Sequence, residues 1–412
     1  MLVGLSAAPR ACATGALLAA AVGCGSTHSR PGTSSPGPPL PPGAPASVSA
    51  PSSCADTVAG TLATVGTRVY REAQSGSNAT EARRRIERSS VLSGAVARGD
   101  GAAAGAALRT LMAGQIIRIE VSDARRVLAG AGHAPAIAPV VGVLRGPTGA
   151  AVGSYRLSVE NEGAFVNLLQ GITGSQVRLS VAHRMLRFTP GFPSGAPAHG
   201  PVRVDAHRAY AVSLPVQTFG GASASTTLLT KPPPRCVGDR AQISATTLGE
   251  VARRIYDEEA MSTRVRTVQA RIGSSTLLRR AVARRDPLGA RQAIVALFRS
   301  HVHVVRVRVS TRREGLLVDV GGPDVLAPVT GPLRDRTGRT VGTLVFALQD
   351  DAGYVKLVRR FTGAEVTLRR RGRLVPSVPA PRARHGRAVR VFSFTGTAFP
   401  AGELRISVLI GD

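Results

Sequence analysis

The chain of 412 residues contains no tryptophan, and aromatic residues make up only 4% of it. All but two of its 53 basic residues are arginine, the exceptions being Lys231 and Lys356. The cores must therefore be built from aliphatic side chains, and a hydrophobic content of 43% is enough for two domains of ordinary size. The shortage of aromatics also argues against single-stranded nucleic acid, whose bases stack on such rings.

Motifs of catalysis and metal binding are missing as well. The sequence has no G-x-S-x-G, H-E-x-x-H, Walker loop or dinucleotide-binding glycine pattern. Its 25 acidic residues leave few candidates for acid–base pairs. His301 and His303 share a strand direction but have no carboxylate or cysteine beside them. We therefore expect no metal, no cofactor and no enzymatic activity.

The amino terminus has the pattern of an export signal. An apolar run over 13–23 follows Arg10 and is too short to span a bilayer. It ends in Ala21-Val22-Gly23-Cys24-Gly25, which resembles a bacterial lipobox, so residues 1–24 are predicted to be a signal peptide with Cys24 lipidated. The alternative is an ordinary signal peptide and a secreted protein. Residues 25–53, rich in proline, serine and glycine, are predicted to be a disordered tether.

Two of the four cysteines remain after removal of the signal and lipidation of Cys24. Cys54 and Cys236 each lie shortly before a repeated helical pattern. Outside the cytoplasm two such cysteines are expected to pair, which would join the starts of the two domains. Two unpaired thiols are the alternative.

The sequence contains the same domain twice. RVYREA at 68–73 returns as RIYDEEA at 254–260, and FVNLLQGITG at 165–174 returns as YVKLVRRFTG at 354–363. The predicted domains are 54–230 and 236–412, joined by the stiff linker 231–235.

Each copy starts with helical spacing and then changes to the alternation of half-buried strands. Short strands are expected near 139–144 and 151–159, and 208–215 is expected to pair with 223–230. One helix lies between these strands in the sequence, with its apolar side chains at Phe165, Leu168, Leu169 and Ile172, and it ends at Thr-Gly. In the second copy 388–395 is expected to pair with 403–410. This order predicts an α+β fold, with an antiparallel sheet and amino-terminal helices packed on it in each copy.

The segment 320–351 resembles the Cache domain. It reads VGGPDVLAPVTGPLRDRTGRTVGTLVFALQDD and is followed by a short helix and Thr-Gly. Cache domains are PAS-like extracytoplasmic sensor modules, so the resemblance implies binding of a small ligand such as an amino acid or carboxylate. The chain reaches Asp412 soon after a strand, without an exit helix or output domain. We therefore expect a signal to pass through a membrane-bound partner protein.

Comparison of the two copies gives the candidate ligand contacts. Ser154, Arg156 and Ser158 share one face of a strand that is mostly apolar in the second copy. If this face lines a pocket, Arg156 would bind a carboxylate in a bidentate pair, and if not it is a solvated face. Tyr354 and Asp350 are further candidates. Tyr354 lies in the helical stripe, which favours a core role, and Asp350 precedes the helix, where an acid complements the dipole.

The net charge is +28, and residues 231–412 hold 33 of the basic and 15 of the acidic residues. Such a protein is attracted to polyanions in general, although export argues against nucleic acid. We expect an exported, lipid-anchored sensor or binding protein on the outer face of a bacterial membrane. The alternative is a structural or adhesive envelope protein bound to anionic polymers.

Overall fold

The computed structural model describes residues 53–112, 115–132, 135–182, 184–204, 207–231, 237–300, 304–313, 315–375 and 389–411. The signal peptide with Cys24, the tether up to residue 52, Cys236, most of the linker and His301 with His303 lie outside these ranges, so the predictions made for them stay predictions. No helix in the described ranges is long and apolar enough to cross a membrane.

The first copy contains five helices and eleven strands in the described ranges. In chain order these are α1 (Cys54–Ser75), α2 (Ser77–Glu87), α3 (Ser90–Ala97), α4 (Gly101–Leu111), β1 (Arg118–Ser122), β2 (Val127–Ala131), β3 (Ala136–Ile137), β4 (Val140–Arg145), β5 (Ala151–Ser158), β6 (Glu160–Asn161), α5 (Glu162–Thr173), β7 (Gln176–Val181), β8 (Arg184–Phe188), β9 (His199–Val204), β10 (His207–Gln217) and β11 (Ser223–Thr230).

The second copy repeats this order. Its elements are α6 (Arg240–Met261), α7 (Thr263–Ser274), α8 (Thr276–Ala283), α9 (Pro287–Ser300), β12 (Arg306–Thr311), β13 (Gly315–Gly321), β14 (Val325–Leu326), β15 (Val329–Arg334), β16 (Thr340–Ala347), β17 (Gln349–Asp350), α10 (Asp351–Thr362), β18 (Glu365–Arg370), β19 (Arg373–Leu374), β20 (Val389–Thr397) and β21 (Glu403–Gly411).

The α+β class with antiparallel sheets is confirmed, but each copy holds two main sheets where the sequence predicted one. The strand orders are β2-β1-β5-β4 and β8-β7-β11-β10-β9 in the first copy, and β13-β12-β16-β15 and β19-β18-β21-β20 in the second. In every sheet the first strand lies between the second and the last. The expected pairings of β10 with β11 and of β20 with β21 are both present.

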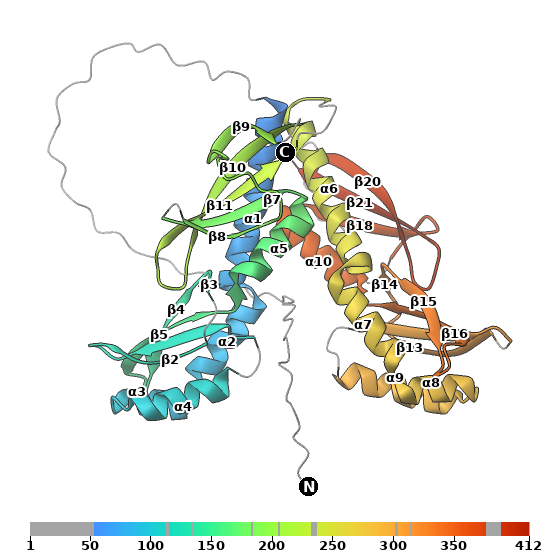
Figure 1. Ribbon diagram of the computed structural model, residues 1–412, viewed down its shortest axis with the longest axis horizontal. Coiled ribbons are helices and arrows are strands. Elements are labelled where there is room, and N and C mark those ends of the chain that lie inside the picture. The colour runs from blue at the N-terminus through green and yellow to red at the C-terminus, as the bar shows by residue number, and fades with distance from the viewer. Residues whose placement is uncertain are drawn as a thin grey trace, which may run out of the picture.

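Each copy is therefore built from two units. The inner unit contains the long first helix, the helix that follows the first sheet, and the second sheet, which in the first copy are α1, α5 and β7–β11. The outer unit contains the three short helices and the first sheet, which are α2–α4, β1, β2, β4 and β5. The short pair β3–β6, or β14–β17, lies at the junction between the units. Figure 1 shows the outer units spread apart and the inner units together.

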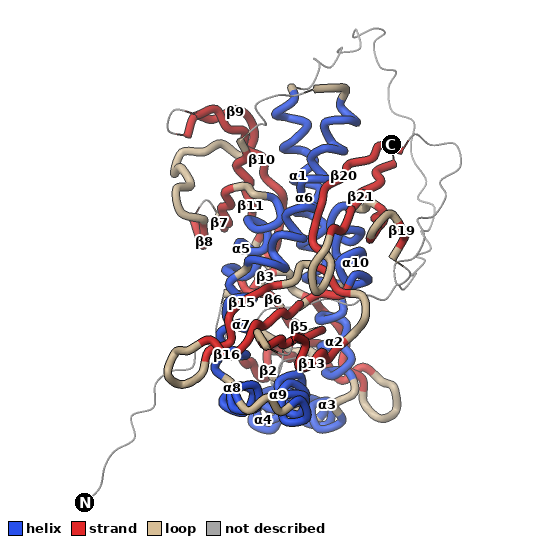
Figure 2. The backbone as a smooth tube through the Cα atoms, turned by 90° about the vertical axis from the view of Figure 1, so that its right-hand side faces the viewer, coloured by secondary structure: helices blue, strands red, loops and turns tan. Residues whose placement is uncertain are grey.

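The two inner units share a single hydrophobic core. Buried side chains from α1 and α5 of the first copy and from α6 and α10 of the second belong to one continuous cluster, whereas each outer unit has a cluster of its own. Near their first turns α1 and α6 also contact through the hydroxyls of Thr61 and Ser244, 3.1 Å apart. Figure 2 shows α1 and α6 side by side, so the duplication builds one body from two copies.

The repeated R-(V/I)-Y motif has the same role in both copies. Tyr70 accepts a hydrogen bond from the backbone of Gln217 at 2.9 Å, and Tyr256 accepts one from the backbone of Thr397 at 2.6 Å. Each tyrosine therefore joins the long helix to the sheet of its own inner unit. Each also contacts, edge to face, the ring that begins the buried stripe of α5 or α10, with ring centroids 6.2 Å apart in both copies.

The arginine of the same motif extends to the other copy. The helices α5 and α10 end in glycines of left-handed conformation, Gly174 with φ 67° and Gly363 with φ 75°, as the Thr-Gly pattern predicted. Arg254 of the second copy covers Gly174, and Arg68 of the first covers Gly363, so closely that a Cβ on either glycine would overlap the guanidinium. A cation at a helix carboxyl end is also favoured by the helix dipole.

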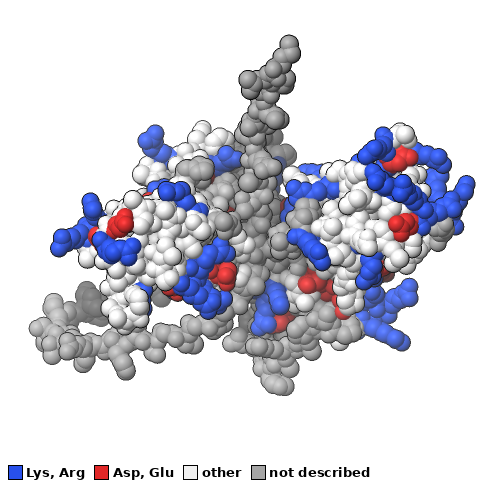
Figure 3. All heavy atoms as spheres, turned by 90° about the horizontal axis from the view of Figure 1, so that it is seen from below, with Lys and Arg blue, Asp and Glu red and all other residues white. Residues whose placement is uncertain are grey.

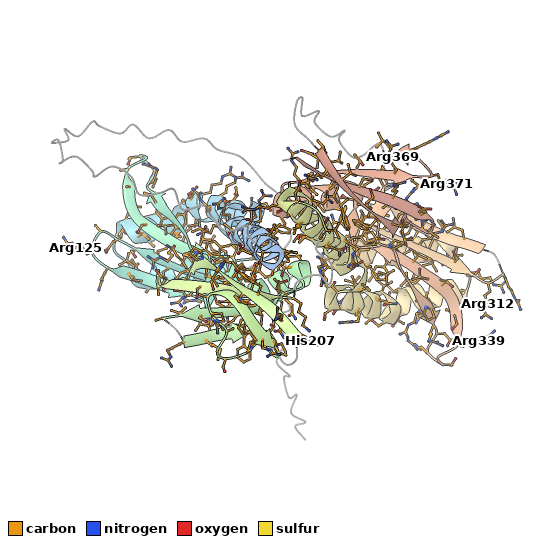
Figure 4. The ribbon with its side chains drawn as sticks, turned by 90° about the horizontal axis from the view of Figure 1, so that it is seen from above. Arg125, His207, Arg312, Arg339, Arg369 and Arg371 are labelled. Atoms are coloured by element: carbon orange, nitrogen blue, oxygen red, sulfur yellow. The ribbon has the colours of Figure 1, made fainter. Side chains whose placement is uncertain are left out.

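The excess of arginine is spread over the surface. Figure 3 shows basic residues on both copies, with fewer acidic residues interspersed among them. Several lie in hairpin turns at the outer edges of the sheets, including Arg125 between β1 and β2, Arg312 between β12 and β13, and Arg371 between β18 and β19 (Figure 4). The basic surface thus includes several separate hairpin tips in addition to arginines on the helices.

Candidate functional site

Two of the predicted ligand contacts lie on the outward face of β5. Arg156 is opposite Glu120 of β1, and Ser154 is opposite Ser122, while the alternate residues of the strand point into the core of the outer unit. Ser154 and Arg156 are half-buried. Neither lines either of the two cavities described below.

Ser158, the third residue of this predicted group, is fully buried. Its hydroxyl donates a hydrogen bond to the backbone carbonyl of Ile137 and also contacts the carbonyl of Glu160 at 2.9 Å. These bonds close the junction between β3 and β6. The structure therefore separates Ser158, with its structural contacts, from the outward-facing pair Ser154 and Arg156.

The two predicted contacts in the second copy also have structural partners. Tyr354 is fully buried in the shared core, and its hydroxyl donates to the backbone carbonyl of Ala252 at 3.0 Å. Burial raises the pKa of Tyr354 well above its usual value. Asp350 caps α10, where its carboxylate accepts a hydrogen bond from the backbone N–H of Gly353.

A cavity with polar walls lies elsewhere, where the inner and outer units of the first copy meet the second copy. It has a volume of about 30 Å³, enough for one or two waters or one small head group. Its lining comes from α1, α2, α5 and the β6 junction of the first copy, and from α10 of the second. The lining residues are Val69, Glu72, Ala73, Asn78, Val159, Glu160, Phe165, Leu168 and Phe361.

One wall of this cavity is an ion pair between the copies. Glu72 on α1 contacts Arg360 on α10, with Oε2 3.0 Å from Nε, and only 12% and 13% of the two side chains are exposed. Burial raises the pKa of Glu72 although the charge of Arg360 opposes this, and burial lowers the pKa of Arg360. Desolvation thus outweighs attraction for both partners. The second carboxylate oxygen of Glu72, Oε1, is buried and has no hydrogen-bond partner among the described residues.

Glu160 forms a second wall. Burial raises its pKa to about 7, and the only opposing contribution comes from the backbone N–H of Asn161. No ion pair of its carboxylate occurs within the described part of the chain. Glu160 is half-buried, and its desolvation costs free energy while it is charged.

Asn78 completes the polar lining. It is 7% exposed, at the first turn of α2, and it lines the cavity. A side-chain amide at a cavity wall offers a ligand both an acceptor oxygen and N–H donors.

The second copy fills the equivalent place with larger side chains. Asn78 corresponds to Arg264, and Ala73 corresponds to Glu259, both 186 positions later in the sequence. Glu259 and Arg264 attract each other, and burial raises the pKa of the glutamate and lowers that of the arginine. Glu160, which is half-buried, corresponds to the neutral Gln349, which is buried. The copies therefore share the scaffold here and differ in the polar groups.

This difference between the copies is visible in the sequence. The comparison of the strand 151–159 with its counterpart pointed to Ser154, Arg156 and Ser158 instead. A comparison of Asn78 with Arg264 and of Glu160 with Gln349 would have pointed to the same place. Which of these residues meet in space could not be found from the repeat alone, because Glu72 and Glu160 are far apart in the sequence.

A larger hollow of about 400 Å³ lies on the surface of the first outer unit. It is lined by Glu81, Arg84, Arg85, Arg88, Ser89 and Leu111. Arg84 and Glu81 form an ion pair at 3.2 Å, but half of each side chain is exposed. The shape of this hollow depends on long solvated side chains, so it is a weaker candidate for a specific site.

No group of three or more histidine, cysteine, aspartate or glutamate side chains within the described ranges has the spacing of a metal site. No protein-family model matches the chain, and no curated protein matches it in sequence. Among solved structures, the chain is similar to an extracellular ligand binding receptor from Desulfohalobium retbaense DSM5692, with 12% identity and a TM-score of 0.24. The similarity covers 40% of this chain and 39% of the receptor, and at this TM-score it supports no argument about fold or ligand.

Proposed function

We propose that this chain is an exported, non-catalytic binding protein of the sensor type, in which the first copy binds a small molecule. The observation that carries the proposal is the cavity at Glu72, Asn78 and Glu160. Oε1 of Glu72 has no hydrogen-bond partner among the described residues, and the second copy has Gln349 at the position of Glu160 and Arg264 at that of Asn78. Polar groups that cost stability and line a cavity are typical of functional sites.

The position of the cavity fits a sensing role. Phe361 and the partner of Glu72, Arg360, belong to the second copy, so the cavity has walls from both copies. A ligand that contacts Glu72 would change the balance of the ion pair between the copies. Its binding energy would then favour one arrangement of the two copies over another, which is what a sensor requires. The Cache resemblance of 320–351 agrees with this role.

The proposal is tested by thermal unfolding of the exported chain against a panel of amines, amino acids and organic acids. A ligand of the cavity raises the unfolding temperature of the wild type, because it binds only the folded state. The variant Asn78→Leu, which removes the amide at similar volume, should lose this response. If no member of the panel stabilises the wild type, or if Asn78→Leu responds equally, the binding role of this cavity is refuted.

The proposed location is the outer face of a bacterial membrane, with Cys24 as the lipid attachment site and a membrane-bound signalling partner. If the anchor exists, Cys24→Ala should appear in the medium instead of the membrane fraction. A secreted protein would appear in the medium with or without the substitution. The proposed Cys54–Cys236 disulfide is tested by mass analysis of the intact chain with and without reduction, which should differ by two hydrogens.

The spread of arginines over the hairpin tips favours a second candidate function. A structural envelope protein would use them to bind anionic wall or membrane polymers. Retention on an anionic polymer that falls steeply with salt, and falls again when Arg369, Arg371 and Arg373 of the β18–β19 hairpin are changed to glutamine, would support it. Retention without dependence on these residues would argue against this candidate.

A further inference from the structure

The two copies share the scaffold of this junction and differ in the charged groups they bring to it. In the second copy, the side chain of Arg264 brings a cation to the start of α7, beside Glu259. In the first copy Asn78 stands at the equivalent position, and the cavity lies beside it. The first copy therefore has no basic side chain of its own at the place of Arg264.

The groups around the cavity are those that bind a cation. Glu160 offers a carboxylate without a charged partner, and Glu72 offers the oxygen Oε1, which is not used by Arg360. The amide oxygen of Asn78, in a side chain that is 7% exposed and lines the cavity, is a further acceptor. An ammonium group has three N–H donors and no acceptor, which matches three such oxygens.

The remaining walls suit a short apolar group. Val69, Phe165 and Phe361 are at most 3% exposed and have no polar atoms in their side chains. Leu168 is 37% exposed and stands where the cavity reaches the surface of α5. The volume of about 30 Å³ admits a head group of the size of ammonium or methylammonium, with any longer chain directed outward past Leu168.

We infer that the first copy binds the ammonium head group of a small primary amine between Glu160, Asn78 and Glu72, at the place that the second copy closes with Arg264. This inference rests on the proposed function and adds the chemical class of the ligand. In the second copy, the guanidinium of Arg264 then takes the place of the ligand's ammonium group, so this copy binds no amine and serves as a scaffold. A carboxylate ligand is disfavoured, because it would meet two glutamates in a buried setting.

The test uses the full exported chain with methylammonium chloride as the probe at pH 8, and with sodium chloride and sodium acetate as controls at equal ionic strength. Methylammonium should raise the unfolding temperature on the order of 2 °C at saturation, and acetate should not. Glu160→Gln should lose the response while remaining folded, because the second copy shows that glutamine is tolerated at this position.

A swap of residues between the copies gives the matched variants. Ala73→Glu with Asn78→Arg places the pair of the second copy in the first, and should abolish the response without loss of folding. Glu259→Ala with Arg264→Asn places the first copy's residues in the second, and should leave the response of the first copy in place. An equal response of the first swap and the wild type to methylammonium would overturn the inference.

The two proposals can fail separately. Stabilisation by acetate, or by another panel member that lacks an amine, with loss of that response in Asn78→Leu, would overturn the amine inference and leave the binding role intact. Absence of stabilisation by any panel member would overturn both. Stabilisation by methylammonium that persists in Glu160→Gln would show binding elsewhere, and would also refute the assignment to this cavity.

Discussion

Glu72 of the first copy and Arg360 of the second form an ion pair in which Oε2 lies 3.0 Å from Nε, with about one eighth of each side chain exposed. The position equivalent to Glu72 is Glu258, but the position equivalent to Arg360 is Gly171. The two copies therefore contribute equivalent residues to their interface, except that Glu72 has Arg360 as its partner where Glu258 has Gly171 beside it. The Glu72–Arg360 pair lies at one wall of the candidate ligand site.

Removal of one partner of this pair should destabilise the whole protein. Glu72→Gln leaves Arg360 buried without a counter-charge, so we expect a loss of roughly 3–5 kcal/mol in the free energy of unfolding. Glu81→Gln, which breaks the exposed pair with Arg84, is the control and should cost less than about 1 kcal/mol. Denaturant unfolding measures both, and similar losses in the two variants would contradict the importance given to the buried pair.

The double replacement Glu72→Leu with Arg360→Met should recover much of this loss. Both side chains are desolvated, and burial shifts their pKa values away from the charged forms. An apolar pair of similar volume avoids that desolvation. Because Glu72 also lines the cavity, the double variant should be stable and yet impaired in ligand response, which separates the two roles of this residue.

The glycine at the end of α10 is predicted to tolerate a side chain less well than a glycine of similar conformation in open space. Gly363→Ala places a Cβ at a φ of 75° and against the Arg68 guanidinium. Gly338→Ala is the control, because its φ is 83° but open space surrounds it. The control should lose about 1 kcal/mol from strain alone, and Gly363→Ala roughly 1–2 kcal/mol more. Equal losses in thermal or denaturant unfolding would show that Arg68 yields without cost.

Glu160 should make the stability depend on pH in a defined window. Its pKa is raised from 4.5 to about 7, so between these values the folded state binds more protons than the unfolded state. The free energy of unfolding therefore falls as the pH rises through this window. Glu160→Gln removes this contribution, and should stabilise the protein at pH 8 by up to about 3 kcal/mol and have little effect at pH 4.

The exposed Glu403→Gln is the control for this experiment. Unfolding curves of the wild type and both variants at several pH values measure the difference, with Glu72 and Arg360 unchanged in all three. If Glu160→Gln stabilises equally at pH 4 and pH 8, the buried carboxyl does not titrate in this window.

The sequence predicted much of the scaffold because the duplication supplied its own comparison. The helix stripe with Phe165 and Tyr354, the Thr-Gly ends and the terminal hairpins follow from periods and turn residues that act locally. The stripe was wrong at one point, since Leu168 is 37% exposed and Val166 is buried instead. The division of each copy into two sheets was missed, because strand alternation does not say which strands pair.

The candidate site was harder to predict for a physical reason. Its polar groups come from α1, α2 and the β6 junction of one copy, with α10 of the other, so only the packing of the two copies brings them together. Ser154 and Arg156 differ between the copies as strongly as Asn78 does, but they face outward. A difference in sequence between the repeats thus identifies candidate ligand-binding residues. Burial of a polar side chain at a cavity then distinguishes the better candidates from residues on an outward face.

Gly171, which lies beside Glu258, offers a gain of stability as the last prediction. A Cβ on Gly171 would lie 2.9 Å from Oε1 of Glu258, the flexible end of a side chain, so a substitution there can be accommodated. Gly171→Arg restores the residue found at Arg360, and should stabilise by about 1 kcal/mol from helix propensity and by a further 0.5 kcal/mol or so from the new ion pair. Gly171→Ala supplies the propensity alone, and Gly171→Arg with Glu258→Gln removes the pair. Thermal unfolding of the three variants should rank Gly171→Arg highest, whereas a tie with Gly171→Ala would mean that the two halves of the interface are not equivalent in structure.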